Sequence, residues 1–211
     1  MTTDSPALQN RVLETQDLSS DPNTKNARAQ RIVDALSGRP IVLIGMMGAG
    51  KTSVGKRLAA WLNLPFLDAD AEIEQAAKMT VSEIFERHGE DYFRDGERRV
   101  VLRMLGDGCR VLATGGGAFM NALTRETIAQ KGISIWLNAE LDVLLRRVRR
   151  RSDRPLLKGS DLEETMQKLI EIRYPVYEQA MISVLSRDSS HEDVLNEVLN
   201  ALEHYLKIGE S

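Results

Sequence analysis

The chain has 211 residues, of which 42% are hydrophobic and 28% are charged, and its net charge is −3. This length fits one domain with a tail, and the small net charge argues against a large basic face for nucleic acid. No run of about 18–20 apolar residues could span a bilayer, and the N-terminus lacks a secretory signal pattern. With Cys109 as the single cysteine, we expect a cytoplasmic protein without disulfides that binds neither nucleic acid nor a membrane.

Residues 1–37 are predicted to form a polar, partly disordered extension, and residues 38–211 a single domain. The first 25 residues or so are rich in Ser, Thr, Asp and Asn, and such a composition buries too little apolar surface to order itself. A short apolar stripe of Ile32, Val33 and Leu36 predicts a helix over about 26–37. We expect this helix to be a solvated extension without a function of its own.

From residue 40 onward, short apolar runs alternate with amphipathic stretches. The runs typical of buried parallel strands lie at 41–44, 64–68, 110–117, 132–138 and 181–186. Helical patterns lie over 53–63, 70–77, 80–88, 92–106, 121–131, 139–150, 160–180 and 192–206. This alternation predicts an α/β fold, a three-layer αβα sandwich around a five-stranded parallel sheet. Ligands are expected at the carboxyl ends of its strands.

The segment GMMGAGKTS follows the first predicted strand and precedes a helix. Its residues Gly45, Gly48, Gly50, Lys51 and Thr52 match the phosphate-loop pattern G-x-x-x-x-G-K-[ST] in full. Glycines let successive N–H groups turn towards an anion, and the helix N-terminus adds partial positive charge. We therefore expect Lys51 to reach the β- and γ-phosphates of a nucleotide and the Thr52 hydroxyl to bind magnesium.

A second acid should support the magnesium ion. P-loop ATPases typically place it at the end of the third strand, but here that strand ends in LATGGG. Asp68 and Asp70 follow the second strand instead. We expect Asp68 to support the metal through water and Asp70 to orient an acceptor hydroxyl and receive its proton. A helix N-cap is the competing interpretation of Asp70.

Arg94 and a run of three glycines are candidates for contact with the acceptor. Arg94 offers a planar fork suited to a carboxylate, although an ion pair on a helix surface is the more ordinary role of such an arginine. Gly115, Gly116 and Gly117 end the third strand. Consecutive glycines cost backbone entropy, and they make sense where the backbone must approach a ligand closely. A plain loop is the alternative.

The arginine-rich segment 146–157 runs up to Arg154 and the proline that follows it. A charge run is usually a solvated helix face. Beside a phosphate site, however, it also predicts a flap that brings an arginine onto the phosphates and excludes water. Further along, Arg173 stands two residues before Pro175, where a helix break is expected.

Together these motifs resemble the shikimate kinases. The segments that carry the resemblance are GMMGAGKTSVGKRLA, FLDAD, FRDGE, VLATGGGA, DRPLL and RYPVYEQA, in the family's order over about residues 40–205. The resemblance implies ATP-dependent phosphorylation of the 3-hydroxyl of shikimate, in aromatic amino acid biosynthesis, by a monomer. It also implies a nucleoside-monophosphate-kinase-like fold with a five-stranded parallel sheet in the order 2-3-1-4-5.

The resemblance assigns the acceptor contacts residue by residue. Asp70 corresponds to the family's acid on the shikimate hydroxyls, and Arg94 and Arg173 correspond to the arginines on its carboxylate. Gly116, between Gly115 and Gly117, corresponds to the backbone that contacts the substrate. Substrate-binding helices are implied over about 71–95.

The resemblance also assigns the nucleotide contacts. Arg154 corresponds to the arginine of a lid, over about 148–160, that closes on ATP. The expected phosphate loop is Gly48, Ala49, Gly50, Lys51, Thr52 and Ser53. Lys51, Asp70 and Arg154 are thus the expected catalytic residues, with Thr52 and Asp68 at the metal.

Other functions share parts of this pattern. A gluconate-type kinase or a nucleoside monophosphate kinase would also have a phosphate loop and a lid. The first does not usually pair GGG with DxD, and the second needs a base-reading acceptor pocket that no residues here suggest. A GTPase is disfavoured because no T-K-x-D-like motif is present. A binding or regulatory module without turnover is opposed by the intact Lys51, Asp70 and Arg94.

Overall fold

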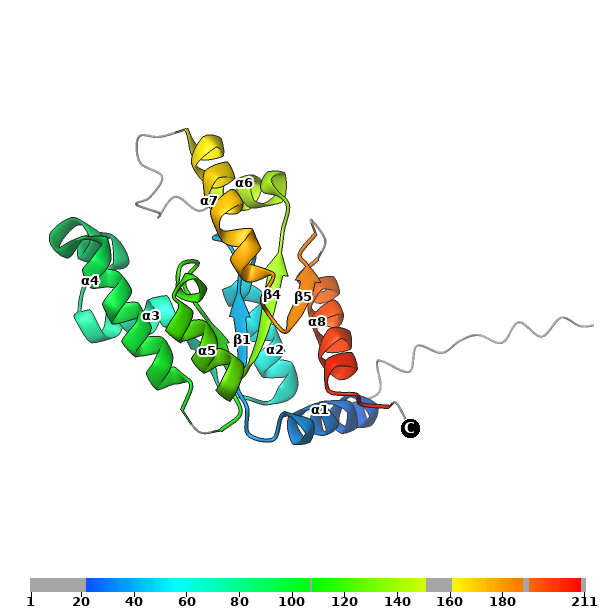
Figure 1. Cartoon of the computed structure of the whole chain (residues 1–211). Coiled ribbons are helices and arrows are strands. Elements are labelled where there is room, and N and C mark those ends of the chain that lie inside the picture. The colour runs from blue at the N-terminus through cyan, green and yellow to red at the C-terminus, as the bar shows by residue number, and fades with distance from the viewer. Residues whose placement is uncertain (1–21, 107, 151–160, 188–189, 210–211) are drawn as a thin grey trace, which may run out of the picture.

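The computed structural model describes residues 22–106, 108–150, 161–187 and 190–209 (Figure 1). Its strands are β1 Ile41–Ile44, β2 Phe66–Asp68, β3 Val111–Ala113, β4 Ile133–Asn138 and β5 Ile182–Leu185. Its helices are α1 Pro22–Leu36, α2 Lys51–Leu62, α3 Ala69–Ala77, α4 Val81–Met104, α5 Ala122–Lys131, α6 Leu141–Arg149, α7 Leu162–Tyr177 and α8 His191–Tyr205, with a 3₁₀ turn, η2, at Ala118–Met120.

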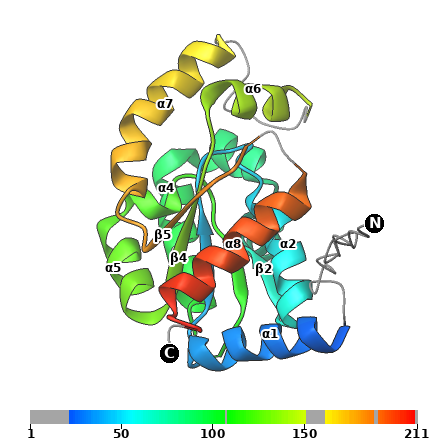
Figure 2. The ribbon, with the colours of Figure 1, turned by 90° about the vertical axis from the view of Figure 1, so that its right-hand side faces the viewer.

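The strands form one parallel sheet in the order β2-β3-β1-β4-β5, which confirms the predicted topology. Helices α2 and α8 cover one face of the sheet and α5 and α7 cover the other, so that in Figure 2 the strands lie between α5 and α7 on the left and α2 on the right. Helix α4 packs against α5. Both faces of β1 are therefore covered, and all four of its residues are buried. This explains why its sequence, IVLI, is continuously apolar rather than alternating.

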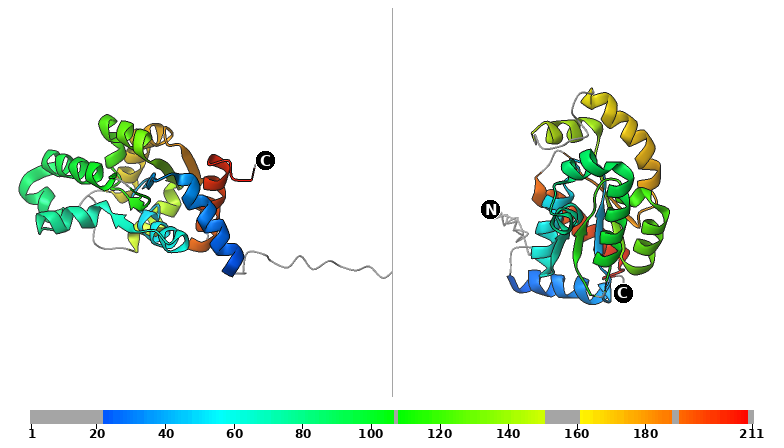
Figure 3. Two further views of the ribbon diagram at one scale, coloured as in Figure 1. Left: turned by 90° about the horizontal axis from the view of Figure 1, so that it is seen from below. Right: turned by 90° about the vertical axis from the view of Figure 1, so that its left-hand side faces the viewer.

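Two helices extend beyond the β2 edge of the sheet. Figure 3 shows α3 and α4 reaching away from the rest of the fold. Gly89, with φ 81° and ψ 176°, interrupts the helical geometry of α4, in agreement with the two separate helices predicted over 80–88 and 92–106. A small apolar core of Ile73, Ile84 and Phe93 holds this projection together.

The helix break expected at Pro175 is wrong, because α7 continues to Tyr177. A proline removes one N–H donor from a helix, but the helical bonding resumes at once, with Glu178 N–H donating to Tyr174 O at 2.9 Å. Arg173 and Tyr177 consequently lie one turn apart on the same face of α7.

The N-terminal helix is part of the folded body. The sequence predicts a solvated helix over 26–37, whereas α1 begins at Pro22 and buries Ile32 and Leu36 completely, each with 0% exposure. Arg28 pairs with Glu203 of α8 through two hydrogen bonds of 2.8 and 2.7 Å, and its guanidinium lies 5.6 Å from the ring centroid of Trp61 on α2. In Figure 2, α1 crosses the end of the sheet opposite α6.

No helix within the described ranges is both long and apolar enough to cross a bilayer.

Replacing Ile32 with alanine tests whether α1 belongs to the core. Removing a fully buried side chain of this size usually costs about 2–5 kcal/mol of stability, measured as the free energy of unfolding in urea. Arg31→Ala, at an exposed position of the same helix, is the matched control and should change stability by less than about 0.5 kcal/mol. Equal effects of the two substitutions would show that α1 contributes no core packing.

Candidate active site

The phosphate-loop segment connects β1 to α2 as the sequence predicts. Gly48 and Gly50 have φ values of 83° and 97°, which side chains rarely adopt. A Cβ on Gly48 would also lie 2.9 Å from Cγ2 of Val148 and 3.1 Å from the carbonyl oxygen of Leu144, so α6 packs directly on the loop. The Lys51 ammonium donates to the carbonyl oxygens of Gly45 and Met46 at 2.9 and 3.0 Å.

Asp68 links the phosphate loop to the start of α3. Its Oδ2 accepts a hydrogen bond of 2.8 Å from the Thr52 hydroxyl, and its Oδ1 accepts one of 3.1 Å from the backbone N–H of Asp70. Asp68 is therefore the N-cap of α3. The N-cap interpretation of Asp70 is wrong, and the exposed Asp70 carboxylate lies in the first turn of the helix instead.

The Thr52 and Asp68 side chains suit magnesium. Both offer hard oxygen ligands, and Mg²⁺ in kinases is usually held by one or two such groups together with phosphate oxygens and water. Among the described residues, no cluster of three His, Cys, Asp or Glu side chains could hold a metal without such help. The donor set thus fits an ion that arrives with a nucleotide.

Four charged side chains converge on the three glycines after β3. A Cβ on Gly117 would lie 2.2 Å from Nη1 of Arg94, and one on Gly116 would lie 3.0 Å from Nη1 of Arg173. A Cβ on Gly115 would lie 2.1 Å from Oε1 of Glu97 and 3.0 Å from Oδ1 of Asp70. This crowding explains why glycine occupies all three positions, because a side chain at any of them would displace one of these charged groups. It argues against the alternative of a plain loop.

The converging side chains come from three separate helices. Asp70 is on α3, Arg94 and Glu97 are on α4, and Arg173 is on α7. Arg94 does make the helix ion pairs of the ordinary interpretation, at 3.0 Å to Glu90 and 2.7 Å to Glu97. It also reaches the glycine turn, however, beside the 8% exposed Arg173. Two guanidinium groups beside an open backbone can bind a small carboxylate.

The sequence reasoning missed Glu97. This carboxyl is only 2% exposed, and its Oε1 has no hydrogen-bond partner within the described part of the chain. Burial raises the pKa of Glu97, and the neighbouring Arg94 guanidinium opposes that rise. A signal was available, since Glu97 interrupts the otherwise apolar buried stripe of α4 that includes Phe93 and Val101.

A cleft of about 400 Å³ joins the phosphate loop to the glycine turn. Its lining includes Gly48, Gly50, Lys51, Thr52, Ser53, Val54, Asp68, Asp70, Thr114 and Gly116. It also includes Arg147, Val148, Arg150, Ser186, His191 and Val194. The volume is in the range of small-molecule sites. A phosphate on the loop and a hydroxyl compound at Asp70 would therefore share one cavity.

Arg147 ties together two walls of this cleft. Its Nη1 donates to the hydroxyl of Ser186 at 2.9 Å, and its Nη2 donates to the carbonyl oxygen of Arg187 at 2.7 Å. A longer bond of 3.4 Å reaches the carbonyl oxygen of Gly48. The solvated-face interpretation of the arginine run is wrong for Arg147, although Arg146, Arg149 and Arg150 are exposed.

The predicted lid over 148–160 falls largely outside the described residues. Only its first residues are described, and of these Val148 and Arg150 line the cleft. Arg154 lies outside the described ranges.

A parallel sheet with a phosphate loop after its first strand, and an acid beside that loop, is the arrangement of the P-loop nucleotide-binding proteins. The family model described as shikimate kinase matches residues 47–203. The chain is 59% identical to the shikimate kinase of Rhodopseudomonas palustris over 182 residues, which cover 86% of this chain and 90% of that protein. It is 56% identical to the shikimate kinase of Bradyrhizobium diazoefficiens over 175 residues, 83% of this chain and 84% of that protein. The chain belongs to the shikimate kinase family.

Solved structures agree with this assignment. A shikimate kinase from Acinetobacter baumannii in complex with shikimate superimposes with a TM-score of 0.77 at 35% identity, covering 85% of this chain and 99% of that one. A gluconokinase from Sinorhizobium meliloti, with a TM-score of 0.56 and 18% identity over 81% of this chain and 94% of that one, shares the fold alone.

The pKa of Glu97 leads to a prediction about stability. Because burial raises this pKa in the folded state, folding favours the protonated carboxyl. The stability that protonated Glu97 contributes is fully present below the pKa of Glu97 in the unfolded chain. It is lost as the pH rises through the pKa of Glu97 in the folded protein. The glutamine side chain of the Glu97→Gln variant is neutral at every pH. The melting temperature of this variant minus that of the wild type should therefore become more positive as the pH rises from 4.5.

Thermal unfolding by circular dichroism at several pH values measures this difference. Glu90→Gln, which alters an exposed partner of Arg94, is the matched control. A Glu97→Gln difference that stays constant, or becomes more negative with rising pH, would contradict the raised pKa.

Proposed function

We propose that this protein transfers the γ-phosphoryl group of ATP to the 3-hydroxyl of shikimate, a step in aromatic amino acid biosynthesis. The observation that carries the proposal is the single cleft lined by both the phosphate loop and the Asp70–Gly116 region, with Arg94 and Arg173 beside it. Shikimate is a small carboxylate with three hydroxyls. Two guanidinium forks and the Asp70 carboxylate therefore match its functional groups.

The triphosphate of ATP would lie on residues 48–53. The N-terminus of α2 and the glycine-rich backbone favour an anion there. Lys51, already held against the loop by Gly45 and Met46, would neutralise charge on the β- and γ-phosphates. The part of the cleft near Ser186, His191 and Val194 is left for the nucleoside.

Thr52 and Asp68 would hold magnesium, which would offset the negative charge that develops on the phosphoryl group during transfer. The hydrogen bond of 2.8 Å between the two side chains keeps their oxygens adjacent. Asp68 would act through water, as the sequence predicts.

Arg94 and Arg173 would fix the acceptor by its carboxylate, next to Gly116 and Gly117. Glu97 would hold the Arg94 fork in place through its bond of 2.7 Å. Asp70 would then face a ring hydroxyl, orient it towards the γ-phosphoryl group and receive its proton late in the transfer. Positioning accounts for most of the catalysis, since the transition state of phosphoryl transfer is loose and needs little covalent assistance.

The other expectations from the sequence stay proposals. Arg154 would close on the ATP phosphates from a lid over about 148–160. We also propose a cytoplasmic monomer that uses neither nucleic acid nor a membrane as a partner. The single cysteine supports the cytoplasmic location, and the net charge of −3 supports the absence of a nucleic-acid partner.

A coupled assay of ADP release with shikimate, gluconate and AMP as acceptors tests the proposed activity. We expect turnover with shikimate and little with the other two, and NMR of the product should place the phosphate on the 3-hydroxyl. Preferred turnover of gluconate or AMP would contradict the proposal. A single-turnover reaction that yields no phosphorylated product would instead indicate a binding module.

Replacing Arg94 with alanine should raise the KM for shikimate by at least about tenfold and leave the KM for ATP within about twofold, because the charged hydrogen bonds to the carboxylate are lost. Arg99→Ala on the exposed side of α4 is the matched control. Arg94→Ala also leaves Glu97 buried without its partner. The variant Arg94→Lys keeps a positive charge beside Glu97 but lacks the guanidinium fork. Its KM for shikimate should therefore lie between those of the wild type and Arg94→Ala. Unchanged shikimate kinetics in both variants would remove Arg94 from the site.

Replacing Asp70 with asparagine should lower kcat by about 10²–10⁴, the usual contribution of a positioned acid or base. ATP should still bind with near-normal affinity, measured by calorimetry, because the phosphate loop is untouched. Glu72→Gln, in the same helical turn but paired with Arg103 at 3.1 Å, is the control. Near-normal turnover of Asp70→Asn would exclude the acceptor-orienting role.

A further inference from the structure

A buried tyrosine connects the two elements that would hold the acceptor carboxylate. We propose that Tyr177 is a positioning residue for the acceptor, because its hydroxyl group fixes the Gly116 peptide, against which the Arg173 guanidinium lies. This inference rests on the proposed function of the site. It concerns a residue that touches neither substrate and acts through two groups that would.

Tyr177 is placed for this role by α7. The helix continues through Pro175, so that Tyr177 follows Arg173 by one turn on the same face. Tyr177 has 0% exposure and Arg173 has 8%. Both side chains therefore point from α7 into the fold, towards the turn that follows β3.

The Tyr177 hydroxyl donates a hydrogen bond to the carbonyl oxygen of Gly116. A peptide group is planar and trans, so its C=O and its N–H point in opposite directions. Holding the carbonyl of Gly116 thus orients the N–H of Gly117 away from Tyr177. A turn of three glycines has no side chains to fix its own orientation, and this bond restrains the Gly116 peptide.

The Arg173 guanidinium lies against the same peptide, since its Nη1 is 3.0 Å from the position of a Cβ on Gly116. Burial raises the pKa of Tyr177 to about 12, although the positive charge of this guanidinium opposes the rise. The hydroxyl is therefore protonated at neutral pH. It acts as a fixed hydrogen-bond donor to Gly116 and not as an acid or base.

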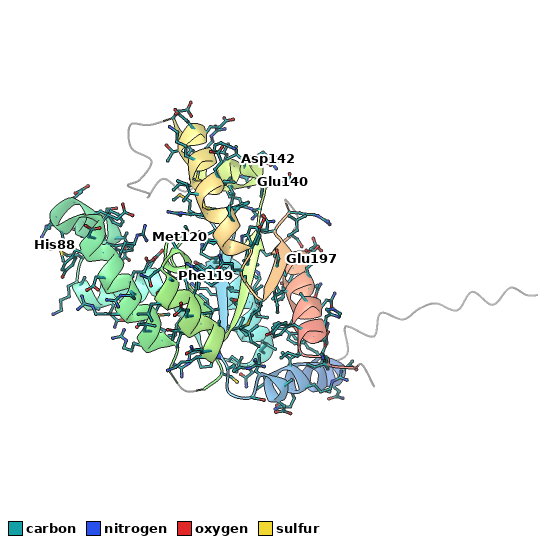
Figure 4. All side chains as sticks on the ribbon, in the orientation of Figure 1. His88, Phe119, Met120, Glu140, Asp142 and Glu197 are labelled. Atoms are coloured by element: carbon teal, nitrogen blue, oxygen red, sulfur yellow. The ribbon has the colours of Figure 1, made fainter. Side chains whose placement is uncertain are left out.

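Aromatic packing keeps the tyrosine ring in place. Its centroid lies 6.4 Å from that of Phe119, 6.0 Å from that of Trp136 and 6.2 Å from that of Tyr174. Figure 4 shows Phe119 and Met120 in the turn after the glycines, which packs against both α4 and α7. A ring confined in this way can place its hydroxyl group accurately.

The chain offers a matched control in Tyr174. This residue lies on the same helix, packs against Trp136 with ring centroids 5.0 Å apart, and donates its hydroxyl proton to the carbonyl oxygen of Ala139. Its bond leads away from the glycine turn. Replacing either tyrosine with phenylalanine removes one part-buried hydrogen bond, but only Tyr177→Phe should affect the acceptor site.

Steady-state kinetics of the full chain, with calorimetry of shikimate binding, test the proposal. Tyr177→Phe should raise the KM and Kd for shikimate by about tenfold, the size expected for one lost hydrogen bond, with the KM for ATP within about twofold. Tyr174→Phe should leave the KM for shikimate within about twofold of the wild type. A double-mutant cycle with Arg173→Lys should show that the effects of Tyr177→Phe and Arg173→Lys on the KM for shikimate are not additive.

Two results would overturn the positioning role. One is an unchanged KM for shikimate in Tyr177→Phe. The other is an equal rise of both KM values in Tyr177→Phe and Tyr174→Phe together with lower melting temperatures, since this pattern indicates a general structural role. A wild-type protein that does not phosphorylate shikimate would refute the proposed function itself, and that result is visible before any variant is made.

Discussion

The site depends on three neighbouring parallel strands that end at the same level. Asp68 of β2 is in register with Ala113 of β3, and Ala113 is in register with Leu43 of β1. Thr114 extends this connection, since its N–H and its hydroxyl both donate to the carbonyl oxygen of Leu43, at 3.2 and 3.1 Å. The segments that leave these strands therefore emerge side by side. They are the phosphate loop, the start of α3 and the three glycines.

The three glycines after β3 leave room for charged side chains at this edge of the sheet. The glycine turn lets Arg94, Arg173, Glu97 and Asp70 come together from three helices, with two positive and two negative groups. The arrangement keeps the buried Glu97 paired with Arg94 while the guanidinium groups remain next to the open backbone. Tyr177 adds no charge to the cluster and joins the turn to α7. An anionic acceptor can thus be bound beside a polyphosphate without a large positive surface.

The residues predicted from the sequence are those with local signals. The phosphate loop and the acid that follows β2 rest on short motifs, and the parallel sheet rests on the alternation of strands and helices. The strand order followed from the resemblance to the shikimate kinases. Glu97 was missed although its place in the apolar stripe of α4 was a local signal. Tyr177 and Arg147 were missed because their roles arise from contacts between segments far apart in the chain. The break at Pro175 and the solvated α1 were wrong for the same reason, since tertiary packing outweighs local preference. The apolar stripe of Ile32, Val33 and Leu36 could have indicated packing, but three residues do not show which part of the protein covers them.

The proposed reaction requires that a nucleotide and a ring carboxylate meet in one cleft over this sheet edge. A crystal structure of the protein with a non-hydrolysable ATP analogue and shikimate measures this directly. We expect phosphates on residues 48–53, the ring carboxylate between Arg94 and Arg173, and a ring hydroxyl between Asp70 and the γ-phosphate. A ring bound elsewhere, with its carboxylate away from both arginines, would contradict it.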